Sequence, residues 1–190
     1  MTEPHPYVKV AESKAIATYL NDHLAGSAAA LDLLAAARGH AHTAVFEGVV
    51  DAVTVEIEQD RETLLGIMAR VDADAGVVKQ TAARVAEKAF RLTASNAVTG
   101  NHALSRLLEL EALCIGILGK RAGWLALQAA NHQALADVDF DRLIGRANDQ
   151  FARLEPYRLE AATAALASSV ADTRGVNDIG PRRDDAIGTL

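Results

Sequence analysis

Two long segments repeat their apolar residues at alternating spacings of three and four, and this helical periodicity most constrains the fold. The stripe in residues 43–71 consists of Phe46, Val49, Val53, Ile57, Asp60, Leu64, Ile67 and Val71. The stripe in residues 102–130 consists of Leu104, Leu108, Glu111, Ile115, Leu118, Ala122, Leu125 and Ala129. Such a spacing lies along one face of a helix. The sequence therefore predicts two long helices, each with one carboxylate at a core position.

The composition also favours helices that pack closely side by side. Hydrophobic residues make up 50% of the chain but aromatic residues only 4%, so aliphatic side chains and alanine must build the core. Periodic patterns predict further helices over residues 13–37 and 77–96. A last helix is predicted to begin after a cap at Asp139 and to bend at Pro156. We therefore expect an all-α protein, a four-helix bundle of two hairpins joined by an additional crossover helix, 77–96.

The chain is expected to form one helical-bundle domain over residues 13–170. Residues 1–12 are predicted to be an N-terminal extension. Residues 171–190, which contain glycines, a proline and the cluster RRDD, are predicted to be a flexible C-terminal tail.

The charge and the apolar segments limit the partners and the location. The formal net charge is −6, from 25 acidic and 19 basic residues. Because the chain is not basic overall, we expect it to bind neither nucleic acid nor an anionic membrane. The N-terminal residues lack the apolar region that a signal peptide contains, so we expect no signal peptide. No apolar run is long enough to span a bilayer. Cys114, the single cysteine, lies within an apolar helical run. These features favour a cytoplasmic protein with a buried, unreactive thiol.

Polar residues at predicted core positions are the strongest indication of a site. His23, Asp60 and Glu111 fall within the stripes of three helices, and Arg158 follows Phe151 and Leu154 on a fourth. Because a buried carboxylate costs several kcal/mol unless it is paired, Asp60 and Glu111 need partners. We favour a structural salt-bridge network in which Arg158, Lys88 or Arg91 neutralises the acids and His23 hydrogen-bonds a neighbour.

The alternative is a metal site inside the bundle. Carboxylates and imidazoles from facing helices hold iron or manganese in such bundles, and the candidate ligands are His23, Glu56, Asp60 and Glu111. However, the chain has no Glu-x-x-His spacing, which di-metal bundles use on two helices. Arg158 on the same stripe would also repel a cation. Both features weigh against the metal site.

Small residues follow one side of segment 102–130, at Ala112, Gly116, Gly119 and Gly123. Each glycine costs about 1 kcal/mol relative to alanine in a helix, so a compensating contact is expected. Close approach of another helix would explain them, and we favour a contact inside the bundle over a dimer interface. If instead this glycine face is exposed in the monomer, a helix-mediated adaptor is indicated.

Four segments together resemble a family of small bacterial helical-bundle proteins similar to ferritin-like proteins. They are YLNDHLAG (19–26), EIEQDRETL (56–64), LSRLLELEAL (104–113) and LEPYRLEAA (154–162). The resemblance implies a ferritin-like bundle and no particular activity. The expected function is therefore self-association, as a homo-oligomer, or protein binding around a structural polar core. The alternative is a metal-dependent oxidoreductase or metal-storage protein, and no small-molecule ligand is indicated.

Overall fold

The computed structural model describes residues 6–39, 41, 43–73 and 102–174. Within these ranges the chain forms α1 (Pro6–Gly39), α2 (Ala44–Arg70), α4 (His102–Ala130), the short 3₁₀ helix η2 (Gln133–Leu135) and α5 (Phe140–Arg174), without a strand. This confirms the prediction of an all-α helical bundle. The predicted helix 77–96 and residues 175–190 of the predicted tail lie outside the described residues. Among the described helices, none combines the length with the apolar composition that a membrane span requires.

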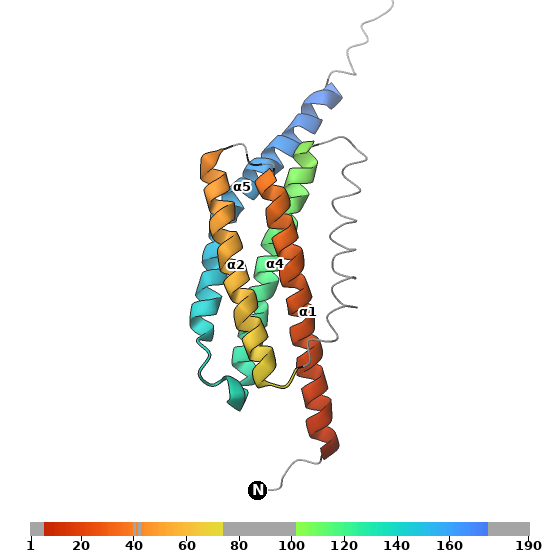
Figure 1. Ribbon diagram of the computed structural model, residues 1–190. Helices are drawn as coiled ribbons and strands as arrows, with labels where there is room; N and C mark the ends of the chain where they lie inside the picture. Colours follow the sequence, from red (N-terminus) through yellow and green to blue (C-terminus); the bar gives the residue numbers. More distant parts are fainter. Residues whose placement is uncertain (1–5, 40, 42, 74–101, 175–190) are drawn as a thin grey trace, which may run out of the picture.

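The helices lie side by side, as the colours in Figure 1 show. α1 and α5 run toward one end of the bundle, and α2 and α4 run toward the other (Figure 1). α1 packs against α2 and α4, while α5 packs against α4 and α2. α1 with α2 and α4 with α5 are thus the two antiparallel hairpins that the sequence predicts.

Capping side chains start two of the helices at the predicted positions. Thr43 Oγ1 accepts a hydrogen bond of 3.2 Å from the backbone N–H of Phe46 and caps α2. Asp139 Oδ1 accepts one of 3.0 Å from the backbone N–H of Arg142 at the start of α5. α5 continues through Pro156 to Arg174, and Figure 1 shows it changing direction in its second half. The bend is expected because proline removes a backbone donor and crowds the preceding turn.

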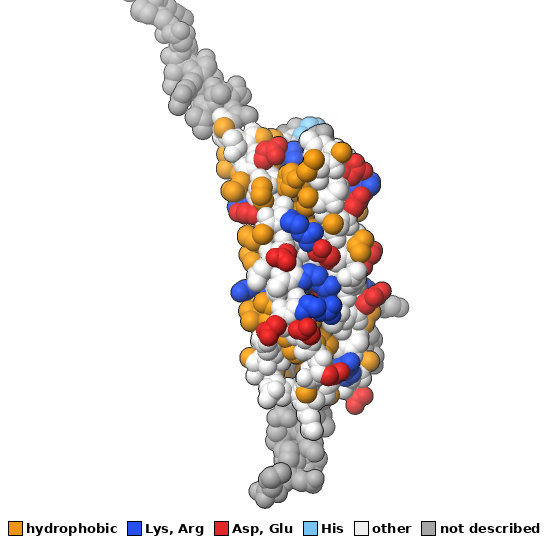
Figure 2. Space-filling view, turned by 90° about the vertical axis from the view of Figure 1, so that its left-hand side faces the viewer, with side chains coloured by type: hydrophobic (Ala, Val, Ile, Leu, Met, Phe, Trp, Pro, Cys, Tyr) orange, Lys and Arg blue, Asp and Glu red, His pale blue; other side chains and the backbone are white. Residues whose placement is uncertain are grey.

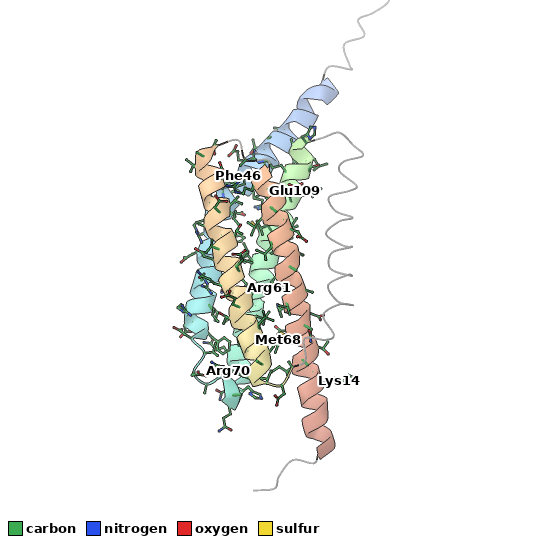
Figure 3. All side chains as sticks on the ribbon, viewed as in Figure 1. Lys14, Phe46, Arg61, Met68, Arg70 and Glu109 are labelled. Carbon is green, nitrogen blue, oxygen red and sulfur yellow. The ribbon has the colours of Figure 1, made fainter. Side chains whose placement is uncertain are left out.

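The core consists of two apolar clusters, one in each half of the bundle. The first includes Leu34, Phe46, Val53, Leu110, Ile117 and Leu154. The second includes Leu20, Leu64, Met68, Trp124, Leu127 and Leu143. Figure 3 labels Phe46 near one end, Met68 near the other and Arg61 between them. Polar residues at mid-height, described below, separate the two clusters.

The core stripe of α4 differs from the predicted one. The buried residues are Leu107, Glu109, Leu110, Leu113, Cys114, Ile117, Gly123, Trp124 and Leu127. The apolar stripe among them is shifted by one residue from the predicted one, which corresponds to a rotation of about 100° about the helix axis. Ile115, Leu118 and Leu125 are consequently exposed, Ile115 to 68%. α4 has apolar residues on nearly every side, and packing against α1 and α5 selected the face that carries Trp124. The prediction that Cys114 is buried is confirmed, and burial raises the pKa of its thiol to about 11.

Candidate functional site

A buried ion-pair layer surrounds Asp60 at mid-height. Asp60 is 2% exposed and receives two cations from different helices. Lys120 Nζ of α4 lies 2.5 Å from Asp60 Oδ2, and Arg146 Nη2 of α5 donates to Asp60 Oδ1. The ion pairs join three helices at one point, so Asp60 has the partners that its core position demands.

Gln150 completes this layer from α5. Its side chain is fully buried; Oε1 accepts from Lys120 Nζ, and Nε2 donates to Asp60 Oδ2 over 3.4 Å. Arg146 also donates to Gln59 Oε1 at 3.0 Å. Burial lowers the pKa of Lys120, and the nearby Asp60 carboxylate opposes that shift. We call Asp60, Lys120, Arg146 and Gln150 the polar layer.

A cavity of about 230 Å³ lies beside the polar layer, between α1, α2 and α4. Its apolar lining includes Ile57, Leu64, Ile117, Trp124 and Leu127, and its polar lining includes Asp22, His23, Ser27, Asp60, Arg61 and Lys120. Gly26, Gly116 and Gly119 line it too and are exposed, so the cavity reaches the surface between α1 and α4. Such a mostly apolar concavity with a few polar groups is typical of small-molecule sites.

The structure divides the predicted glycine stripe into two kinds of position. A Cβ on Gly123 would lie 2.7 Å from Cε1 of His23, so this glycine allows α1 and α4 to approach closely. A Cβ on Gly116 or Gly119 would meet nothing within 4 Å among the described residues. Gly123 thus fits the expected internal contact, whereas Gly116 and Gly119 leave the cavity open.

These two kinds of glycine predict opposite effects on stability. Gly119→Ala is expected to raise the free energy of unfolding by about 0.5–1 kcal/mol, since alanine has the higher helix propensity. Gly123→Ala should instead lower it by about 1–3 kcal/mol, because the new methyl group overlaps the imidazole. Chemical denaturation of both variants tests this. Adding His23→Ala should remove most of the loss at Gly123, and a loss that persists would contradict the steric cause.

His23 is half-buried on α1, with Tyr19 edge-on to its ring at 4.7 Å between centroids. Burial lowers the pKa of His23 below 6.5, while Asp22 acts in the opposite direction. The unfolded chain therefore binds the proton more readily than the native protein. The stabilisation from neutral His23 is present above about pH 6.5 and is lost as the pH falls through the lower native pKa.

This shift predicts a pH dependence of stability. Between about pH 8 and about pH 5 the free energy of unfolding should fall more in the native sequence than in His23→Gln, which does not titrate there. Denaturant titrations at both pH values measure the difference. Equal losses in the two proteins would show that His23 makes no contribution.

Glu56 and Glu111, the other predicted acids, form ion pairs of their own. Glu56 pairs with Arg153. Glu111 is partly exposed and lies 3.4 Å from Arg158 Nη1, and Arg158 also pairs with Glu155 at 2.5 Å. Of the four predicted metal ligands, His23 and Asp60 line the same cavity, while Glu56 and Glu111 belong to separate ion pairs. The described residues contain no group of three or more His, Cys, Asp or Glu that could hold a metal ion.

Sequence reasoning missed the residues that neutralise Asp60. Arg158, Lys88 or Arg91 were the predicted partners of Asp60 and Glu111. Arg158 pairs with Glu111 but not with Asp60, and residues 88 and 91 lie outside the described residues. One signal was present: Leu143, Ala147, Gln150 and Leu154 follow the three-four spacing, and all are buried. The position of Gln150 on this apolar stripe indicates a polar side chain in the core, and it could have identified α5 as the helix that supplies the polar partner.

Charged side chains also gather on the face that α2 and α5 form. Figure 2 shows Lys and Arg side chains gathered at mid-height on the face formed by α2 and α5, with acidic side chains around them. Arg142, Arg146 and Arg153 line a shallow hollow there together with Glu56 and Asp149. Because acids and bases alternate across this face, it offers no strong field of one sign.

The chain matched no family model, no curated protein and no solved structure in comparisons with each. The fold and the site by themselves define the class of this protein: an all-α helical bundle with a buried ion-pair layer and an adjoining cavity.

Proposed function

We propose that this chain is a non-enzymatic, ferritin-like helical-bundle protein that acts by associating with a second copy of itself. Self-association is carried by one observation, the exposed apolar stripe of Ile115, Leu118, Ala122 and Leu125 on α4. Their three-four-three spacing is that of a helix seam, and the small Ala122 permits close approach of a partner helix. Since Ile115 and Leu118 are large, leaving this stripe in water is unfavourable.

A second copy is the occupant that this stripe fits best. Packing α4 against its own symmetry mate would place the same residues on both sides, as a two-fold interface requires. The two apolar stripes would then cover each other, and both would leave water.

The ion pairs at Asp60 support a structural role for the polar core. Lys120 and Arg146 occupy both carboxylate oxygens, so a cation would have to displace two positive groups. The directions of α2 and α4, which run the same way in Figure 1, support the ferritin-like crossover arrangement.

Light scattering coupled to gel filtration tests the proposed association. We expect the native protein to be a dimer and Ile115→Glu/Leu118→Glu to be a folded monomer. The matched control is Val45→Glu/Val55→Glu, which changes two exposed apolar residues of α2 and should remain dimeric. A monomeric native protein, or a dimer that survives the α4 changes, would contradict the proposal.

Elemental analysis tests the structural role of the core. Protein purified without chelator should contain iron, manganese and zinc far below one equivalent. Near-stoichiometric metal that is lost in Asp60→Asn would instead favour the metal-dependent oxidoreductase or metal-storage protein.

A further inference from the structure

We propose that the cavity between α1, α2 and α4 binds a small uncharged molecule that has an apolar body and one hydroxyl group, such as an alkylphenol. The apolar walls hold the body, and His23 bonds the hydroxyl. This cavity is separate from the exposed α4 stripe that carries the proposed association, so either proposal can fail without the other.

The walls of the cavity are mainly hydrocarbon. Ile57, Leu64, Ile117 and Leu127 line it from α2 and α4. Trp124 lines it as well, and because its Nε1 is buried, the indole presents carbon atoms to the open space. Such walls favour an apolar ligand body, since binding removes the hydrocarbon surface of both the ligand and the protein from water.

The charged residues in the described lining balance one another. They are two acids, Asp22 and Asp60, and two bases, Arg61 and Lys120. Lys120 pairs with Asp60 at 2.5 Å, and Arg61 donates to Ser27 Oγ at 3.1 Å. Asp22 is exposed, so water screens its charge. The lining therefore has no net charge that would favour an anion or a cation, whereas a charged ligand would lose hydration on entering.

His23 offers a hydrogen bond to a ligand. It lines the cavity from α1 and is half-buried. Within the described residues neither ring nitrogen has a hydrogen-bond partner, and neither is fully buried. Burial lowers the pKa of His23, so the ring is neutral above about pH 6.5, with one nitrogen as donor and the other as acceptor.

A hydroxyl group suits a neutral imidazole whichever ring nitrogen carries the proton. It can donate to the unprotonated nitrogen or accept from the N–H, whereas a carbonyl oxygen only accepts and an ammonium only donates. One hydroxyl is therefore the polar group expected on the apolar ligand.

The volume limits the ligand to about the size of a substituted benzene. A protein cavity of about 150 Å³ binds benzene, so about 230 Å³ admits about nine non-hydrogen atoms by proportion. 4-Ethylphenol has this size and carries one hydroxyl. Benzoate and phenethylammonium have the same number of non-hydrogen atoms but carry a negative and a positive charge, and ethylbenzene lacks only the hydroxyl.

Glycines on two walls allow the cavity to be filled by substitution. Gly26 of α1 and Gly116 of α4 line it, and a Cβ on either meets nothing within 4 Å among the described residues. Leucines there would occupy the open space, and neither position belongs to the exposed α4 stripe. Gly48 and Gly66 on α2 are equally unobstructed and are absent from the described lining. Gly48→Leu/Gly66→Leu is therefore a matched control for Gly26→Leu/Gly116→Leu.

Isothermal titration calorimetry of the full-length protein with 4-ethylphenol, at about pH 7.5 where His23 is neutral, tests the site. We expect saturable binding with a Kd below about 5 mM. The affinity should fall at least about tenfold in Gly26→Leu/Gly116→Leu and stay unchanged in the α2 control. Benzoate and phenethylammonium should each bind at least about tenfold more weakly than 4-ethylphenol. Circular dichroism confirms that the variants remain folded.

His23→Leu provides a second measurement, since this change removes both ring nitrogens. The affinity for 4-ethylphenol should fall about tenfold, while the affinity for ethylbenzene should not change. The proposal is overturned if 4-ethylphenol does not bind with a Kd below about 5 mM, or if the cavity variant binds it as well as the control. A charged analogue that binds as tightly as 4-ethylphenol would overturn the uncharged assignment. An equal loss of both ligands in His23→Leu, or no loss of either, would overturn the bond between hydroxyl and imidazole.

Discussion

Asp60→Asn is expected to lower the free energy of unfolding by about 3–5 kcal/mol, the largest effect of any single change near the polar layer. Asparagine keeps the shape of the side chain but removes its charge. Lys120 and Arg146, whose side chains are each 17% exposed, would then face a neutral amide. The cost comes from leaving two largely buried cations without their counter-ion.

Urea denaturation followed by circular dichroism measures this loss. The matched control is Asp51→Asn, because Asp51 also pairs with an arginine, Arg38, at 2.5 Å but is about half exposed. That change should alter stability by about 1 kcal/mol or less. If the two substitutions cost the same, burial does not determine the energetic role of Asp60.

Replacing the whole charged set should cost less than breaking it. In Asp60→Leu/Lys120→Met/Arg146→Met/Gln150→Met neither an uncompensated charge nor the buried amide of Gln150 remains, and apolar side chains fill a similar volume. We expect this quadruple variant to be more stable than Asp60→Asn. A quadruple variant less stable than Asp60→Asn would show that the hydrogen bonds of the layer, rather than charge compensation, stabilise the fold.

Phe46→Ala is expected to lower the free energy of unfolding by about 3–5 kcal/mol. Phe46 is 2% exposed at the start of α2 and packs on Tyr157 of α5, with ring centroids 4.6 Å apart. The guanidinium of Arg106 on α4 lies 5.4 Å from its ring centre. One ring thus connects three helices, and truncating it leaves a large void.

Thermal and denaturant unfolding measure this second loss. Val45→Ala changes the preceding residue, which is 72% exposed, and should shift stability by less than about 0.5 kcal/mol. Phe46→Leu separates apolar volume from aromatic contact and should cost about 1–2 kcal/mol. A loss of similar size in Val45→Ala would mean that the effect arises from the helix start rather than from packing.

Local sequence determined the helices because their signals lie within a few residues of one another. Thr43 and Asp139 can cap their helices wherever the rest of the chain lies, since each bonds a backbone N–H three residues ahead. The three-four spacing of Phe46, Val53 and Ile57 predicted the buried face of α2 correctly, even though Val45, Val55 and Leu65 are exposed on its other faces. Asp60 was recognisable as a core carboxylate for the same reason.

Tertiary structure decided which face of α4 is buried and which residues neutralise Asp60. α4 has two overlapping apolar stripes, one residue apart, and its own sequence does not distinguish them. Only packing against α1 and α5 buried Trp124 and left Ile115 exposed. The partners Lys120 and Arg146 are 60 and 86 residues from Asp60 in the chain. These side chains reach Asp60 only because of how α2, α4 and α5 pack against one another. The periodicity within a single helix carries no information about that packing.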